Sequence, residues 1–166
     1  MLLACHNGHD PCVRLLMSYM APFPSDVSVY LASPLPDATR KWVAEAERWS
    51  SPLHFVDVNS CERTLSLLRG GADIHASRRS GLPTPLDVAL AKGGDSASLV
   101  LRAGTPWSVG THSLFPSQAR RRAYELLMVG RLFASSRFEG QEQAFFDVWQ
   151  FGVMPHAIVR TTASAE

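Results

Sequence analysis

Two short stretches of this chain, Ser51-Pro52-Leu53-His54 and Thr84-Pro85-Leu86-Asp87, nearly match and lie 33 residues apart. Each leads into a short apolar run, and a second run follows that ends in Leu-Leu or Val-Leu before a glycine. A self-similar period of this length is typical of repeat proteins, in which each helix pair buries its apolar side against its neighbours. The pattern therefore predicts an all-α fold of stacked helix pairs.

Helix chemistry agrees with these boundaries. In both stretches the proline suits the first turn of a helix, where a missing N–H costs nothing. The residues before it, Ser51 and Thr84, can cap the free N–H groups of that turn. Gly71 and Gly104 follow the expected second helices, where glycine most easily adopts a left-handed backbone.

Further stretches match a known repeat family. The middle stretch continues as Gly71-Ala72-Asp73-Ile74-His75-Ala76, and the N-terminus reads Ala4-Cys5-His6-Asn7-Gly8-His9. They resemble the ankyrin repeat, whose pattern runs T-P-L-H-x-A-A-x-x-G-H, then V-x-L-L-L, then G-A-D-V-N-A. The resemblance covers residues 1–20 and 51–104, which is about two and a half degenerate repeats. It implies an ankyrin-type helix-turn-helix solenoid, with the chain beginning inside a repeat and with His54 bonding to backbone in the adjacent turn.

The segment before Ser51 is too long for adjacent repeats, which implies an inserted helix. Within the predicted helix 36–49, Trp42, Ala46 and Trp49 fall on one stripe. Packing against the middle repeat is the favoured interpretation of that stripe, and an exposed aromatic anchor for a partner is the alternative. The sequence thus divides into a partial repeat at 1–20, an insertion at 21–50, two repeats at 51–104, a C-terminal helical extension at 105–160 and a disordered tail at 161–166.

The C-terminal extension is predicted to hold two helices, at 116–134 and at 142–153, the second stopped by Pro155. The second helix is apolar nearly all round, so it is either buried or available to a partner. The run from Glu142 to Phe151, followed by Met154-Pro155, resembles the opening helix of an F-box. That resemblance implies a substrate adaptor of a cullin-type ubiquitin ligase, with Phe146 and Phe151 as adaptor-box residues. The favoured interpretation is a helical cap that covers the hydrophobic face of the last repeat, and the adaptor box is the alternative.

Composition limits the function classes. The chain has 166 residues, of which 46% are hydrophobic and 19% charged, so a sizeable core is possible. A net charge of +1 argues against a generally basic nucleic-acid binder. No apolar run reaches the roughly 18 residues that a membrane span needs, and the N-terminus makes a poor signal peptide. Three unpatterned cysteines indicate free thiols. We therefore expect a cytoplasmic or nuclear protein without membrane contact.

Residues that could carry chemistry do not form a recognisable site. The spacing of Cys5, His6, His9 and Cys12 could suit a metal, but the repeat pattern and helix positions already explain these residues. His54 lacks the third orienting group that a catalytic set requires. We expect no enzyme activity, metal or cofactor.

Two further features also favour ordinary structural roles. The stretch Lys92-Gly93-Gly94-Asp95 lacks the frame of a phosphate-binding loop. The basic cluster of Arg120, Arg121 and Arg122 with Arg131 is most simply a solvated helix face, so nucleic-acid binding is not favoured.

The expected function is therefore that of a protein–protein interaction scaffold. In ankyrin arrays the first helices and the loops line a concave face, and the resemblance places the partner-binding surface there. Arginine in such a loop suits bidentate contact with an acidic partner. The expected partner-binding residues are Phe55, Val58, Asn59, Ser77, Arg78, Arg79, Ser80, Val88, Ala91 and Lys92.

Overall fold

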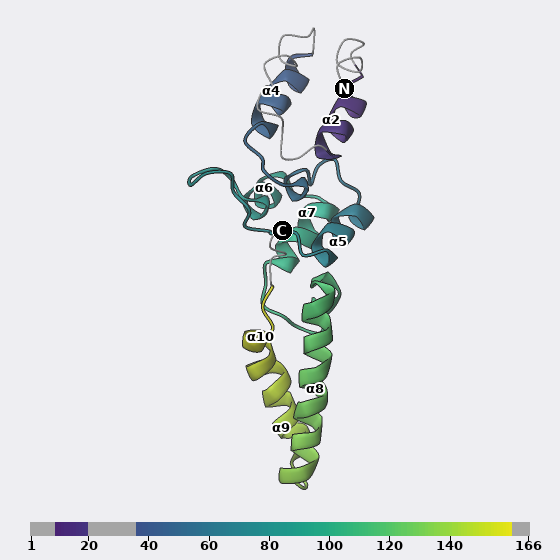
Figure 1. The fold of residues 1–166 in the computed structure, drawn as a ribbon, viewed down its shortest axis with the longest axis vertical. Coiled ribbons are helices and arrows are strands. Elements are labelled where there is room, and N and C mark those ends of the chain that lie inside the picture. The colour runs from purple at the N-terminus through teal and green to yellow at the C-terminus, as the bar shows by residue number, and fades with distance from the viewer. Residues whose placement is uncertain (1–8, 20–35, 161–166) are drawn as a thin grey trace. The chain divides into compact units, whose positions relative to one another are not determined.

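The computed structural model describes residues 9–19 and 36–160 of the chain (Figure 1). The start of the N-terminal partial repeat, most of the loop in the insertion and the predicted tail at 161–166 lie outside the described residues. All regular elements within the described residues are helical, which confirms the all-α class. The chain forms two compact units, Met1–Leu67 with Asp73–Leu101, and Leu68–Ala72 with Arg102–Glu166.

The first unit contains most of the predicted repeat region. The predicted helix pair after Thr84 is confirmed as α6 and α7. The inserted helix is confirmed as α4, but it ends at Ala46 instead of Trp49. The elements are α2 (Asp10–Tyr19), α4 (Asp37–Ala46), the 3-10 turn η1 (Pro52–His54), α5 (Cys61–Arg69), α6 (Pro85–Lys92) and α7 (Asp95–Ala103), of which α5 and α7 end in residues of the second unit.

The first helix expected in the middle repeat is wrong, because only the single turn η1 forms there. The side chain of Asn59 donates to the carbonyl oxygen of Pro52 at 2.7 Å, which is the acceptor that a continuing helix would use. Asn side chains compete with helical backbone bonding in this way. The backbone then closes in tight turns, as Val58 N and Asn59 N both donate to the carbonyl of Phe55.

The tryptophan stripe of the insertion packs inward. Trp49 and Ala46 are fully buried and Trp42 is nearly so. The Trp49 ring meets Phe55 edge-on at 4.8 Å between centroids, and Trp42 at 5.7 Å. The indole N–H of Trp42 donates to Asp57 at 2.9 Å. The packing interpretation is thus confirmed, and the exposed-anchor alternative is wrong.

The two helix-ending glycines behave differently. Gly71 takes a φ of 85°, as predicted for a residue that closes a helix in the left-handed region. Gly104 does not take a positive φ. There Thr105 N donates to the carbonyl of Arg102 at 3.2 Å, so a 3-10 closure satisfies the last turn of α7 instead.

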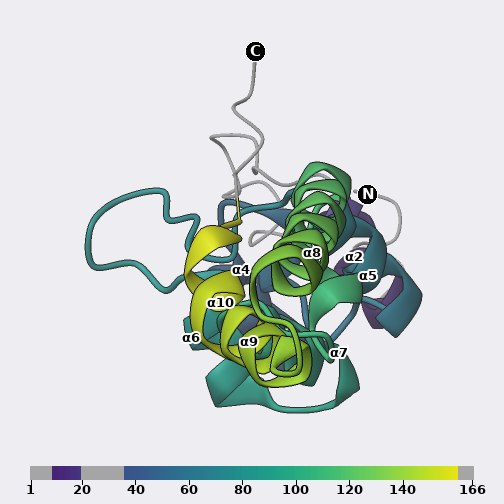
Figure 2. The same ribbon diagram turned by 90° about the horizontal axis from the view of Figure 1, so that it is seen from below.

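The second unit is a helical hairpin with its own core (Figures 1 and 2). Its elements are η2 (His112–Leu114), α8 (Ser117–Arg137), α9 (Glu142–Val148), the π turn η3 (Trp149–Val153) and α10 (Met154–Ala157). The segment from α9 to α10 runs back along α8. Small residues on α8 allow this close packing, and the buried core consists of Trp107, Phe115, Ala119, Ala123, Met154 and Ile158.

The prediction that Pro155 stops the last helix is wrong, because the helix continues to Ala157. Proline lacks an N–H and normally breaks a helix interior. Here the π turn η3 precedes it, so Pro155 stands in the first turn of the new helix α10, where no N–H is required.

Candidate functional site

His54 joins the two matching sequence stretches. Its ring is fully buried and stacks near Trp49. The backbone N–H of Ser51 points at Nδ1 over 3.2 Å, which assigns the proton to Nε2. Nε2–H therefore donates to the carbonyl of Pro83 at 3.0 Å. The expected bond from His54 to backbone in the adjacent turn is confirmed.

This environment favours the neutral imidazole. Burial lowers the pKa of His54 below its ordinary value of 6.5, and the backbone hydrogen bonds oppose that effect only in part. Burial also lowers the pKa of His112 in the second unit, with a smaller contribution from Arg120. Both groups thus take up a proton more readily in the unfolded chain.

We expect the protein to lose stability when it is acidified through the histidine range. Because the folded pKa of His54 is lowered, the unfolded state binds more protons, so the stabilising effect is complete above 6.5 and declines below it. The urea concentration at the midpoint of unfolding should be lower at about pH 5.5 than at about pH 7.5. The variant His54→Gln should show a smaller fall, whereas the exposed control His75→Gln should behave like the wild type. An equal fall in all three proteins would contradict this assignment.

Thr84 and Asp87 fix the start of α6. Asp87 Oδ2 accepts hydrogen bonds from Thr84 N at 2.8 Å and from Thr84 Oγ1 at 2.7 Å, while Asp87 N donates to Thr84 Oγ1 at 3.2 Å. These bonds lower the pKa of Asp87. The predicted cap is confirmed, and Asp87 completes a capping box.

The loop tip from Ser77 to Ser80 is exposed, as the partner-binding prediction requires. The loop extends away from the helices of its unit (Figures 1 and 2). Ser77 Oγ lies 2.7 Å from the carbonyl oxygen of Arg79 and 3.1 Å from that of Leu82, which folds the loop base. Gly81 has a φ of 84°, a conformation that favours glycine. Neither Arg78 nor Arg79 forms an ion pair among the described residues.

The helix-borne part of the predicted surface is only partly accessible. Phe55, Asn59 and Val88 are buried, so their assignment as partner-binding residues is wrong. The reason is the single turn η1, which directs Phe55 into the cluster of Trp42 and Trp49.

The other predicted positions keep some exposure. Val58 is half-buried, and Ala91 and Lys92 are exposed. Lys92 Nζ lies 3.1 Å from Glu45 Oε2, so its charge is partly compensated. Leu90 was not among the predicted surface residues, but it is 75% exposed on α6. The sequence signal for this exposed position is that Leu90 directly follows Val88 and Ala89, which are buried on α6.

The two predicted adaptor-box residues differ in environment. Phe146 is half-buried, with the guanidinium carbon of Arg131 5.8 Å from its ring centre. Phe151 is 70% exposed, and Val148 beside it is also exposed. The opposite stripe, Phe145 and Trp149, faces inward and is half-buried. Apolar side chains therefore remain accessible on one side of this segment.

The spacing of Cys5, His6, His9 and Cys12 could suit a metal. Cys5 and His6 lie outside the described residues, and His9 and Cys12 are exposed. Within 9–19 and 36–160, no group of three or more His, Cys, Asp or Glu side chains could hold a metal ion. In the same parts of the chain, no helix combines the length and the apolar character needed to cross a membrane.

Comparison of the chain with protein-family models, with curated proteins and with solved structures finds no match.

Proposed function

We propose that this chain is an ankyrin-type interaction scaffold that binds another protein through its first unit. The observation that carries the proposal is the hydrogen bond from His54 to the carbonyl of Pro83. It connects the first sequence motif to Pro83, which lies 29 residues further along the chain and directly precedes the second motif. A stacked array requires contacts of this kind between successive repeats.

The α6–α7 pair supports the same proposal. It has the length, the Thr84 cap and the buried inner side of a repeat helix pair. The backbone N–H of Leu86 also donates to the carbonyl of Ile74 at 3.2 Å, which ties the start of α6 to the stretch that ends the preceding repeat-like segment. The cap role of residues 105–160 stays a prediction.

The proposed partner-binding surface comprises the loop tip Ser77–Ser80 together with Leu90, Ala91 and Lys92. Arg78 and Arg79 form no ion pair among the described residues. They favour a partner that carries carboxylates, because the guanidinium group binds carboxylates in bidentate fashion. Leu90 adds an exposed apolar contact, and such contacts commonly supply interface affinity. The proposed activity is binding rather than catalysis. Both ring nitrogens of His54 form hydrogen bonds with backbone groups, which gives this histidine a structural role.

The double variant Arg78→Ala, Arg79→Ala tests this surface. It should fold like the wild type, because both side chains are exposed and form no ion pair within the described part of the chain. In pull-downs quantified by mass spectrometry it should lose an acidic partner that the wild-type chain retains. We expect the affinity for this partner to fall about tenfold when the two charged arginine side chains are removed.

Arg137→Ala is the matched control, because Arg137 is an exposed arginine of the second unit. It should retain the partner. A partner retained equally by all three proteins would remove the loop from the site.

The exposed side chains Phe151 and Val148 favour one second candidate, a substrate adaptor of a cullin-type ubiquitin ligase. An adaptor box needs one stripe packed inward and another available to the ligase subunit, which matches this segment. The same mass-spectrometric experiment distinguishes the two functions. Recovery of a cullin adaptor subunit with the wild-type chain supports the second candidate, and its consistent absence leaves the plain scaffold.

A further inference from the structure

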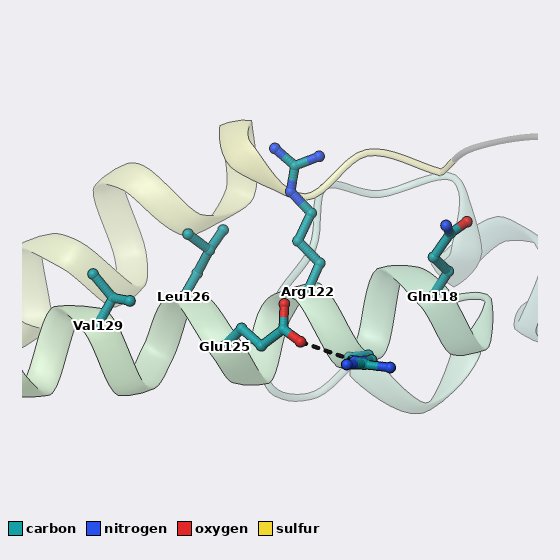
Figure 3. A pocket seen from close by; sticks show the side chains of 6 residues that line it. Gln118, Arg122, Glu125, Leu126 and Val129 are labelled. Atoms are coloured by element: carbon teal, nitrogen blue, oxygen red, sulfur yellow. Dashed lines mark hydrogen bonds and ion pairs between the residues drawn. The ribbon is translucent and has the colours of Figure 1, made fainter.

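A shallow hollow of about 540 Å³ runs along one side of α8 (Figure 3). We call this surface the α8 groove, and its lining residues are Gln118, Arg121, Arg122, Glu125, Leu126 and Val129. The side chains of Gln118, Arg122, Leu126 and Val129 project to the same side of the helix in Figure 3. Their spacing of three or four residues explains this alignment.

One end of the α8 groove carries uncompensated positive charge. Arg121 Nε lies 2.9 Å from Glu125 Oε1, so that charge is paired. Arg122 is exposed and forms no ion pair among the described residues.

The other end of the α8 groove is apolar. Leu126 is half-buried against the core of the hairpin, and Val129 is exposed beside it. At a rise of 1.5 Å per residue, Arg122 and Val129 stand about 10 Å apart along the helix axis. A ligand that satisfies both ends must therefore place an anion and an apolar group roughly 6–10 Å apart.

We propose that the α8 groove binds an acidic amphipathic peptide helix of another protein. A carboxylate opposite Arg122 forms a charge-assisted hydrogen bond, and apolar side chains four and seven residues away cover Leu126 and Val129. Helices dock in grooves through this spacing of anchors. The site uses residues of the second unit only, so it goes beyond the function proposed above.

Nucleic acid fits the α8 groove less well. A phosphate backbone would meet the carboxylate of Glu125 and the apolar side chains of Leu126 and Val129, where further cations would be needed. A second copy of this chain also fits less well. The acidic, apolar series Asp147, Phe151 and Met154 has the required spacing, but Met154 is fully buried.

The test is a selection of random 16-residue peptides displayed against the full chain. Each selected peptide should carry an Asp or Glu, with apolar side chains four and seven residues away from it. Measured by fluorescence anisotropy, labelled peptides should bind Arg122→Glu and Val129→Ser about tenfold more weakly than wild type. Replacing the peptide carboxylate by lysine should restore binding to Arg122→Glu.

Arg137→Glu is the control, since Arg137 is an exposed arginine at the far end of the same helix. It should keep its affinity, as should Arg78→Ala, Arg79→Ala, which separates this site from the surface proposed on the first unit. Circular dichroism verifies that each variant is folded. The proposal is overturned if the selected peptides lack this pattern, or if Arg122→Glu and Arg137→Glu weaken peptide binding equally. It is also overturned if a thymidine oligonucleotide binds the groove more tightly than the peptides do, or if only a dimer of the chain binds the peptides.

Discussion

Gly130→Ala should open the helical hairpin of the second unit. A Cβ atom at Gly130 would lie 2.5 Å from both Cδ1 and Nε1 of Trp149, closer than atoms can approach. The ring cannot move away freely, because its N–H donates to the carbonyl of Leu126 at 3.0 Å. Overpacking together with loss of that hydrogen bond should lower the free energy of unfolding by about 3 kcal/mol. Urea unfolding followed by circular dichroism measures this change.

Gly152→Ala is the matched control, because an added Cβ there meets only Val148, at 3.9 Å. We expect it to change stability by less than about 1 kcal/mol, and in the favourable direction, since alanine is the better helix former. The double variant Gly130→Ala, Trp149→Ala should be less destabilised than the sum of its single changes, because the clash is then removed. If the two glycine variants have the same stability, the close approach of α8 and Trp149 is contradicted.

Phe55→Ala should destabilise the first unit by about 3–5 kcal/mol. The side chain is fully buried and contacts Trp49 edge-on and Trp42 at 5.8 Å between centroids. Its removal leaves a cavity between two large rings, which cannot collapse easily. Thermal or urea unfolding gives the magnitude, and hydrogen exchange assigns the loss to the first unit.

Phe151→Ala removes the same side chain from an exposed position, so it should change stability by no more than about 0.5 kcal/mol. The pair therefore separates a core phenylalanine from one that is available to a partner. If Phe55→Ala kept full stability and weakened partner binding, Phe55 would belong to the interface after all.

Local patterns predicted the parts of the fold whose partners are close in sequence. The α6–α7 pair follows from Thr84, Pro85 and helical periodicity, all within a few residues. The burial of Trp42 and Ala46 on α4 follows from their helical spacing in the same way, whereas Trp49 is buried just beyond the end of that helix. The bond from His54 to Pro83 is a longer contact, and it was predicted only because the ankyrin resemblance implies it.

The errors arose where a nearby side chain or a change of helix type altered the backbone. The Asn59 amide takes the acceptor that the first helix of the middle repeat would need, and Phe55 then turns inward instead of lining a surface. Proline rules alone predict a helix end at Pro155, whereas the π turn before it allows continuation. The solvated-face interpretation of the arginine cluster agrees with the structure, because Arg121, Arg122 and Arg131 are exposed on α8.

The π turn at Trp149–Val153 also determines which side chains of the returning helical segment face α8. Trp149 and Met154 are five residues apart, yet both meet the α8 side of the unit. In a regular α-helix, residues five apart point about 140° away from each other. One surplus residue in the turn therefore brings both anchors to the same side. Deletion of one residue from this turn would restore regular helical spacing and turn Trp149 and Met154 away from each other, so one of the two anchors would lose its contacts with α8.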